Sequence, residues 1–230
     1  MIDLYTGPTP NGWKISIMLE ECGLDYRPHW VNIRKGEQFE PGFLAISPNN
    51  KIPAIVDKAP DDEGPSVTVF ETGAILLYLA EKTGMFLPLD LRGRKAAHEW
   101  LFWQSSGFGP MLGQHGHFKL YAPKRIAYAI DRYRKETLRL YGVLDRQLSV
   151  SAYVAGGEYG IADMSLFPWV QTYRAQEIDL GSFPAVQRWY EELKQRPALR
   201  RGMNVLREHI AHRPQDEDDA RRLLFGFVEY

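Results

Sequence analysis

The sequence predicts an α/β domain followed by an all-helical domain. Up to about residue 83, short strand-like segments alternate with helical ones, whereas after residue 92 no strand pattern appears. Between these parts lies a segment with Gly84 and Pro88, residues that are typical of a linker. We therefore expect domains at residues 1–83 and 93–210, a linker at 84–92 and a C-terminal tail at 211–230.

The first domain should follow the order β-α-β-α-β-β-α. A strand at residues 2–5 leads into a Gly/Pro-rich loop, and Asn11 opens a helix whose Ile15, Met18 and Leu19 share one face. The remaining elements are expected as strands at 27–33, 52–57 and 66–70 and as helices at 39–44 and 72–82. This mixed order, with a parallel half and a terminal hairpin, is that of a thioredoxin-like domain.

The second domain should contain at least four helical stretches. Residues 94–121 are helical in pattern with a break near 107–110, and 161–176 and 185–195 give two more helices. A long helix is indicated by apolar or small side chains at three- and four-residue steps, namely Ile126, Ile130, Tyr133, Thr137, Leu140, Leu144 and Leu148. Gly160 and Asp163 are placed to form a capping box, which we interpret as a folding element.

Composition argues against several classes of partner. A net charge of −1 gives no basic field for nucleic acid or an anionic membrane. The longest strongly apolar run, at 74–80, is too short to cross a bilayer. The lone cysteine, Cys22, cannot form an internal disulfide and fits a reducing compartment. With no signal-peptide pattern at the N-terminus, we expect a cytoplasmic protein.

Two segments together predict a site for a small acidic peptide. The first, at 47–56, delivers Ile52-Pro53 to the start of a strand, and the proline biases Ile52 towards an extended main chain. Such a main chain can pair with a peptide as an added strand. The second, at 67–75, runs from a strand through Glu71-Thr72 into a helix. The free N–H groups at that helix start suit a carboxylate.

These segments resemble the glutathione site of the glutathione transferase superfamily, and the residues from Tyr5 to Lys14 are similar to its nu class. The resemblance extends to about Leu206. It implies glutathione as cosubstrate, with two reduced molecules or one oxidised molecule per site. It also implies glutathione-dependent reduction of small disulfides, with organic hydroperoxides and electrophiles as further substrates, and a homodimer.

For catalysis the resemblance points to Thr9 and Asn11 as donors that hold the glutathione sulfur as a thiolate. Their position, where a strand gives way to a helix, favours an anion, although Thr-Pro-Asn-Gly is also a common turn and cap. Tyr5 is a rival, as other classes use a tyrosine there, but it fits a packed strand aromatic. Ser16 and Cys22 are poorer candidates because they lie within or at the far end of the helix.

For binding, the resemblance assigns Ile52 to the cysteinyl unit through its main chain and implies a cis bond to Pro53. It assigns Glu71 and Thr72 to the γ-glutamyl end and Gln38 and Lys51 to the glycine end. Taken alone, Glu71 could simply complement the helix dipole, and Lys51 could be a solvated loop lysine. Arg132 corresponds to a nu-class arginine that binds a second anion, although by spacing it belongs to a solvated basic face.

A second interpretation is a non-catalytic, transferase-like binding or regulatory module, since fold does not fix function. The complete set of glutathione residues favours the enzyme. His209 and His212 are three residues apart and would share a helix face, but no third metal ligand follows at a suitable spacing, so we expect no metal site. The 115–117 segment should lie on the substrate side of the cleft. The tail ends in apolar residues after an acidic stretch, and we expect it to dock.

Overall fold

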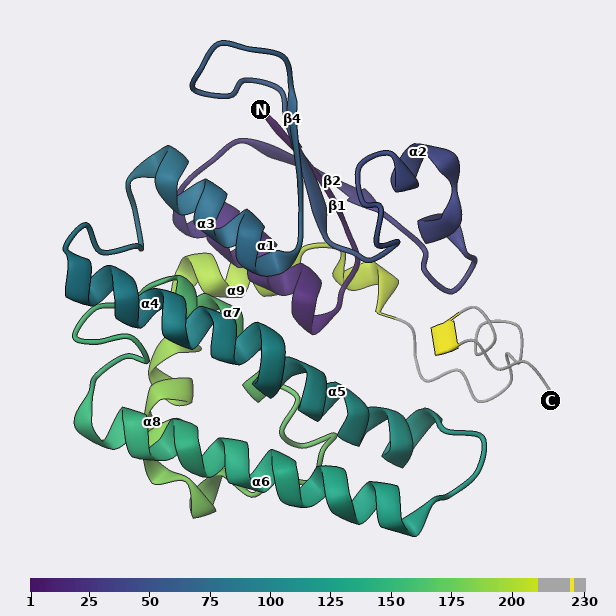
Figure 1. Cartoon of the computed structure of the whole chain (residues 1–230), viewed down its shortest axis with the longest axis vertical. Coiled ribbons are helices and arrows are strands. Elements are labelled where there is room, and N and C mark those ends of the chain that lie inside the picture. The colour runs from purple at the N-terminus through teal and green to yellow at the C-terminus, as the bar shows by residue number, and fades with distance from the viewer. Residues whose placement is uncertain (211–223, 226–230) are drawn as a thin grey trace.

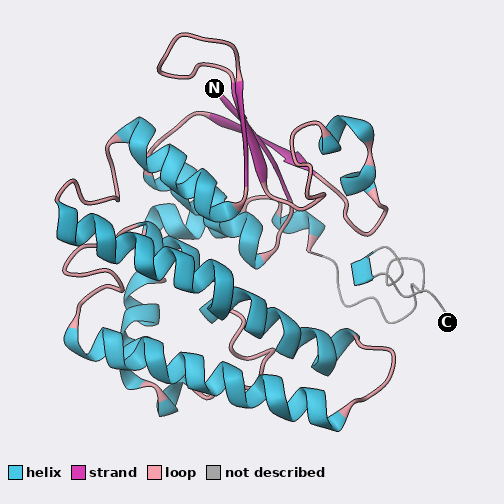
Figure 2. Ribbon diagram, viewed as in Figure 1, coloured by secondary structure: helices cyan, strands magenta, loops and turns pink. Residues whose placement is uncertain are grey.

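The computed structural model describes residues 1–210 together with 224 and 225 (Figures 1 and 2). Its strands are β1 (Ile2–Thr6), β2 (Tyr26–Trp30), β3 (Ala54–Asp57) and β4 (Val67–Phe70). Its α-helices are α1 (Pro10–Glu21), α2 (Pro41–Leu44), α3 (Thr72–Thr83), α4 (Leu91–Trp103), α5 (Gly109–Gly116), α6 (Ala127–Val150), α7 (Ile161–Val170), α8 (Pro184–Leu193) and α9 (Pro197–Asn204). Short 3₁₀ turns are η1 (Glu37–Phe39), η4 (Leu180–Ser182) and η5 (Arg207–His209), and π-helical turns are η2 (Gln104–Phe108) and η3 (His117–Tyr121).

The first part of the chain has the predicted order of elements, but β2 ends at Trp30, β3 begins at Ala54, and the helix expected at 39–44 is divided into η1 and α2. Its sheet has the order β2-β1-β3-β4, in which β1 pairs with β2 in parallel, and β3 pairs antiparallel with β1 and β4. The sequence of elements is β-α-β-α-β-β-α, as in a thioredoxin-like domain. In Figure 1, α1 and α3 lie between this sheet and the helical domain, and α2 lies on the far side. Residues 84–90, within the predicted linker, carry neither helix nor strand.

The helical part departs from prediction in three places. The expected break near 107–110 is the π-helical turn η2, so helical structure continues from α4 through η3. Pro110 has no N–H to donate, and a local widening of the helix is a common response to such a residue. Helix α7 contains Pro168 and ends at Val170, before the expected residue 176. Helix α9 was not predicted.

Helix α9 packs directly on α1 and joins the two domains. Ser16 donates its hydroxyl to the carbonyl oxygen of Gly202 at 2.8 Å. A side chain at Gly202 would have its Cβ 2.6 Å from the Ile17 main chain, so only glycine permits this approach. Arg196 forms two hydrogen bonds to Glu21, at 2.8 and 2.7 Å. These contacts fix the orientation of α1, whose first turn forms part of the site described below.

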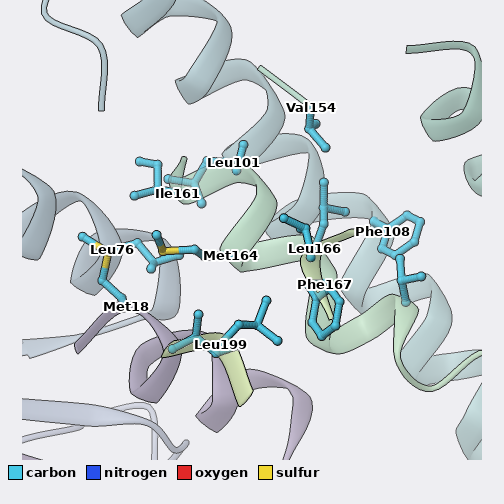
Figure 3. Packing of buried hydrophobic residues seen from close by; sticks show 14 of the residues in the cluster. Met18, Leu76, Leu101, Phe108, Val154, Ile161, Met164, Leu166, Phe167 and Leu199 are labelled. Atoms are coloured by element: carbon cyan, nitrogen blue, oxygen red, sulfur yellow. The ribbon is translucent and has the colours of Figure 1, made fainter. Parts of the chain in front are cut away.

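The hydrophobic core is continuous across both domains. Met18 of α1, Leu76 of α3, Met164 of α7 and Leu199 of α9 belong to one buried cluster and lie close together in Figure 3. Burial of apolar surface contributes about 25 cal/mol per Å², so the shared core holds the two domains in one arrangement. Within the described ranges, no helix combines the length and apolar character needed to span a membrane.

The Asp163 half of the predicted capping box is present at the start of α7, whereas Gly160 has no side chain to supply the other half. Asp163 Oδ2 accepts from the Gly160 N–H at 3.0 Å. Asp163 Oδ1 accepts from the main-chain N–H of Val154 at 3.0 Å and from the indole N–H of Trp189 at 2.8 Å. Gly160 has an extended φ of −155°, so a positive φ is not the reason for glycine here. The reason is space, because a Cβ would lie 2.8 Å from the Phe86 carbonyl oxygen.

Candidate active site

A cavity of about 640 Å³ lies between the two domains, at the start of α1. Its walls come from the first turns of α1 and α3, from the loops before β3, and from the helical domain. The lining residues are Thr9, Pro10, Asn11, Lys14, Ile33, Gln38, Phe39, Asn50, Lys51, Ile52, Glu71, Thr72, Gln104, Ser105, Gly109, Pro110, Gly113, Gln114, Trp169, Leu224 and Phe225. The structure thus brings together every predicted site residue except Pro53 and Arg132.

Thr9 is the N-cap of α1. Its backbone is extended, with φ −128° and ψ 159°, and its hydroxyl oxygen accepts from the Gly12 N–H at 3.1 Å. Because a hydroxyl has one proton and two lone pairs, this bond leaves the Thr9 O–H free to donate. Gly12 is required here, since a Cβ would lie 2.2 Å from the Gly7 carbonyl oxygen. The cap therefore satisfies the helix and still offers a donor at the cavity.

Asn11 is oriented by a residue from the other domain. The indole N–H of Trp169 donates to Asn11 Oδ1 at 3.1 Å. An indole N–H can only donate, so the amide oxygen must face Trp169 and the amide NH₂ must point elsewhere. Pro10 has no N–H, and the N–H groups of Gly12 and Trp13 bond to Thr9. The donors that this turn can offer a ligand are thus those of Asn11 and the Thr9 hydroxyl.

The opposite wall supplies main-chain groups and a buried amide. The Ile52–Pro53 peptide is cis, as predicted. The β-ladder register begins at Ala54, so the Ile52 main chain lies outside it. Gln38 is 5% exposed, and its Oε1 has no hydrogen-bond partner among the residues that the structure describes. An unpaired buried amide oxygen costs about 1–3 kcal/mol, and a ligand N–H at the cavity would remove that cost.

Glu71 and Thr72 form the third wall at the start of α3. Glu71 has φ 70° and ψ 123°, a conformation that L-residues rarely adopt and that costs about 1–3 kcal/mol. Its carboxylate accepts from Asn49 Nδ2 at 3.3 Å and is exposed to the cavity mouth. Thr72, the first residue of the helix, accepts from Lys14 Nζ at 3.2 Å. Strained residues of this kind are concentrated at ligand sites.

Among the lining residues that sequence reasoning did not assign to the site, Lys14, Gln104 and Trp169 form hydrogen bonds within the cavity wall. Lys14 is 2% exposed and donates from Nζ to Gln104 Oε1 at 2.7 Å as well as to Thr72. Desolvation lowers the Lys14 pKa to about 7, and the charge of Glu71 opposes this shift. In sequence, a lysine in the second turn of an amphipathic helix carries no such signal.

Arg132 lies elsewhere. It is exposed on α6 and lines a second cavity, of about 520 Å³, together with Met111, Tyr128 and Arg139. Met111 belongs to α5, whose Pro110, Gly113 and Gln114 line the first cavity. The two cavities therefore lie on different faces of α5, and the second-anion role of Arg132 stays a prediction.

The rival residues occupy structural positions. Tyr5 stacks on His29 with ring centroids 4.6 Å apart, and it is not among the lining residues of the cavity. Ser16 bonds to α9, as described above. Cys22 is half-buried beside Thr83, with Sγ 3.6 Å from the threonine hydroxyl, and burial raises its pKa. A raised pKa disfavours the thiolate, so Cys22 is unsuited to act as a nucleophile.

Two residues of the tail reach the site. Leu224 and Phe225 line the cavity, and the Phe225 ring stacks on Tyr121 with centroids 5.4 Å apart and meets His117 at 4.8 Å. The other residues of the 211–230 tail, His212 included, lie outside the described residues. His209 stacks on Trp30 at 3.7 Å. Of the predicted 115–117 segment, His115 is buried rather than at the cavity wall.

Comparison with known proteins defines the family. Residues 9–82 match the model of the glutathione S-transferase N-terminal domain, and residues 109–197 match that of the C-terminal domain. The chain is 53% identical to the disulfide-bond oxidoreductase YfcG of Escherichia coli K12, covering 94% of this chain and all of that protein. The chain therefore belongs to the glutathione S-transferase family, as the opening resemblance implied.

Two solved structures resemble it closely. A glutathione transferase of Burkholderia graminis with two glutathione molecules bound per subunit has a TM-score of 0.85 and 45% identity, covering 88% of this chain and 87% of that one. A glutathione transferase of Pseudomonas putida with one glutathione disulfide bound per subunit has a TM-score of 0.84 and 43% identity, covering 89% and 91%. At these identities the likeness extends beyond the fold to the class of enzyme.

Proposed function

We propose that this glutathione-dependent disulfide-bond oxidoreductase holds the sulfur of glutathione as a thiolate at the start of α1. The Thr9 hydroxyl and the Asn11 amide would donate to the sulfur, in the positive field of the helix N-terminus. The observation that carries the proposal is the hydrogen bond from Trp169 to Asn11, which leaves the amide NH₂ available. Each donor favours the thiolate because it interacts more strongly with the anion than with the thiol.

The rest of the cavity would hold the tripeptide. The Ile52 main chain would pair with the cysteinyl unit as an added strand, next to the cis peptide bond to Pro53. Glu71 would accept from the γ-glutamyl ammonium, and Thr72 would donate to its carboxylate. Gln38 and Lys51 would bind the glycine end. The strained Glu71 backbone and the unpaired Gln38 oxygen support a ligand at these places.

The chemistry is thiol–disulfide exchange. Overall, one disulfide and two glutathiones give two thiols and one glutathione disulfide, through a mixed disulfide. The reacting sulfur belongs to glutathione, because Cys22 is half-buried and has a raised pKa. The related structures hold two glutathiones in one case and glutathione disulfide in the other, which are the reductant and the product of such a reaction.

The same activated thiolate would react with organic hydroperoxides and with electrophiles, which we propose as further substrates. We also propose that the protein is a cytoplasmic homodimer. Its domains would comprise residues 1–83 and 93–210, joined by a linker at 84–92. Arg132 would bind a second carboxylate. In that cavity Lys135 pairs with Asp131 and Arg139 pairs with Glu136, so the exposed Arg132 guanidinium is the cation that supports an anion there.

The test compares Thr9→Ala and Asn11→Ala with wild type in glutathione-dependent reduction of 2-hydroxyethyl disulfide, with Tyr5→Phe as the control. Loss of one donor to a developing anion should lower kcat/KM on the order of 10- to 100-fold. Tyr5→Phe should be nearly silent, since Tyr5 stacks on His29 outside the cavity lining. Loss of activity in Tyr5→Phe alone would assign the role to tyrosine. If wild type is retained on immobilised glutathione but does not reduce 2-hydroxyethyl disulfide, the result would instead support a non-catalytic binding module.

A further inference from the structure

Lys14 is a buried amine in the wall of the cavity. It lies one helical turn after Asn11 and is 2% exposed. Lysine is almost never so fully buried unless it is paired with an opposite charge. Both groups to which Lys14 donates are neutral, the Gln104 amide oxygen at 2.7 Å and the Thr72 hydroxyl at 3.2 Å. In these two hydrogen bonds the ammonium is therefore stabilised by neutral dipoles and not by a carboxylate.

The Thr72 hydroxyl gives the protonation state of Lys14 a consequence. An ammonium has three donors and no acceptor, so Lys14 can then only donate to Thr72. The Thr72 O–H is in that case free to point at a ligand. A neutral amine has a lone pair and can instead accept a hydrogen bond from the Thr72 O–H. The hydroxyl is then no longer free to donate to a carboxylate in the cavity.

The charged surroundings of Lys14 make it responsive to an anion. Among the residues that the structure describes, Glu71, at the start of α3, is the charged group that raises the Lys14 pKa electrostatically. The π-helical turn η2 contributes neutral Gln104, and α7 contributes Trp169 to the same cavity. Arg196, which precedes α9, and Arg201, on α9, pair with Glu21 and Glu20 at the far end of α1. Desolvation holds the Lys14 pKa at about 7, so a nearby negative charge would shift the amine towards its protonated form.

We propose that Lys14 is a positioning residue for the γ-glutamyl end of glutathione, and that the Lys14 amine takes up a proton from solvent as the γ-glutamyl carboxylate binds at Thr72. The ammonium then donates to Thr72, and Thr72 donates to the carboxylate. Such a chain of hydrogen bonds polarises itself and strengthens each bond. This inference rests on the proposed glutathione site and adds to it a coupling between ligand and proton.

The experiment is titration calorimetry of S-methylglutathione, which has no thiol proton to release. Binding is measured at pH 7 in several buffers of different ionisation enthalpy, and the slope of the observed enthalpy gives the protons taken up. Wild type should take up on the order of half a proton per site, because an amine with a pKa of about 7 is half protonated at this pH. Its affinity should tighten as the pH falls from 8 to 6.

Lys14→Met should abolish the buffer dependence and weaken binding by about tenfold. Its melting temperature should stay close to that of wild type, because removal of a desolvated amine favours folding, whereas the Gln104 amide oxygen left without its donor opposes folding. Lys82→Met is the matched control, since Lys82 contacts Asp57 at 3.0 Å and Asp61 at 2.7 Å away from the cavity. It should lower the melting temperature and leave proton uptake unchanged. Lys14→Gln serves if Lys14→Met does not fold.

Three outcomes separate the possibilities. Binding by wild type without proton uptake would overturn the role of Lys14 and leave the proposed function standing. Proton uptake that persists in Lys14→Met and Lys14→Gln would overturn it as well, because another group would then be titrating. Failure of wild type to bind S-methylglutathione at all would overturn the proposed function and the inference together.

Discussion

Two helix starts in this chain use the same physics for different ends. At α1 the cap is Thr9, the turn lines the cavity, and Asn11 is oriented by the indole N–H of Trp169. At α7 the cap is Gly160, the turn is buried, and Asp163 receives the indole N–H of Trp189. At each helix start, one side chain therefore accepts a hydrogen bond from a tryptophan of the helical domain, Trp169 on α7 or Trp189 on α8.

The difference lies in what remains unsatisfied. Both oxygens of the Asp163 carboxylate accept hydrogen bonds, three in total, from within the protein. At α1 one tryptophan bond fixes Asn11 while its amide NH₂ and the Thr9 hydroxyl proton stay available. A helix start whose carboxylate is fully hydrogen-bonded within the protein contributes stability, and one whose side-chain donors are left available for an anion contributes chemistry. Substitutions at the two sites should therefore separate stability from activity.

The largest effect is expected from Asp163→Asn. The substitution keeps the volume but replaces one accepting oxygen with an NH₂ that faces an N–H donor. Since buried donors left unpaired are costly, the free energy of unfolding should fall by about 3 kcal/mol, measured by urea denaturation. Ser165→Ala, at a buried position whose hydroxyl bonds only within its own helix turn to Ala162, should cost clearly less. Equal losses in both would show that the box carries no special weight.

The same variant has a pH signature. Burial raises the pKa of Asp163 to about 6, above the value of about 3.9 in an unfolded chain. Between these values the folded state holds more protons than the unfolded state, so this group makes wild type less stable as the pH rises. Asp163→Asn lacks the group. The gap in unfolding free energy between the two proteins should therefore be wider at pH 4.5 than at pH 7, and a constant gap would contradict the raised pKa.

A smaller effect is expected from the two tryptophans, which form a matched pair. Trp169→Phe removes the N–H that orients Asn11, so kcat/KM for disulfide reduction should fall about fivefold, the equivalent of one net hydrogen bond. Trp189→Phe removes an N–H from Asp163 and leaves space in the core, so stability should fall by about 1–3 kcal/mol. Kinetics and thermal melting on both variants check the pair. Activity loss in Trp189→Phe at full stability would break the comparison.

The two helix starts also show what local sequence can predict. The helix starts at Thr9–Asn11 and Gly160–Asp163 were predicted from short-range patterns, because caps and capping boxes involve residues three or four apart. The proposed catalytic role of Thr9 and Asn11 came from the family resemblance. The order of elements in the first domain followed from the alternation of strand and helix patterns. What sets each site's properties is long-range. Trp169 meets Asn11 across 158 residues, and Gln104 meets Lys14 across 90, and no periodicity in the sequence encodes such contacts.

Helix α9 was not predicted from the sequence, and the role of Arg132, predicted by resemblance, stays a prediction. The α9 segment is short and rich in arginine, and it is held by close approach of Gly202 to Ile17, a feature visible only in the fold. Arg132 was assigned to the cleft by resemblance, whereas spacing alone placed it on an exposed basic face. In the structure Arg132 is exposed, as its spacing indicated, and it lines the second cavity rather than the first. Local patterning predicted burial better than it predicted contacts between domains.

The smallest effect is expected at Gly160, and it tests why the α7 cap differs from the α1 cap. Serine is normally the better N-cap, by a few tenths of a kcal/mol over glycine. The extended φ of −155° at this position suits serine, so no backbone strain opposes the change. Crowding does oppose it, because the new Cβ would lie 2.8 Å from the Phe86 carbonyl oxygen, which already accepts from the Ile161 N–H at 3.1 Å.

Gly160→Ser should therefore lose about 1 kcal/mol of stability, the order of a mild overpacking, and leave kcat/KM unchanged. Gly157→Ser is the control, since it is exposed and a Cβ there would meet no atom within 4 Å. That change should shift stability by less than about 0.5 kcal/mol. A higher melting temperature for Gly160→Ser would mean that the Phe86 segment gives way readily. Gly160 would then be simply a weaker N-cap than serine or threonine. Close packing would no longer explain why α7 begins with glycine and α1 with Thr9.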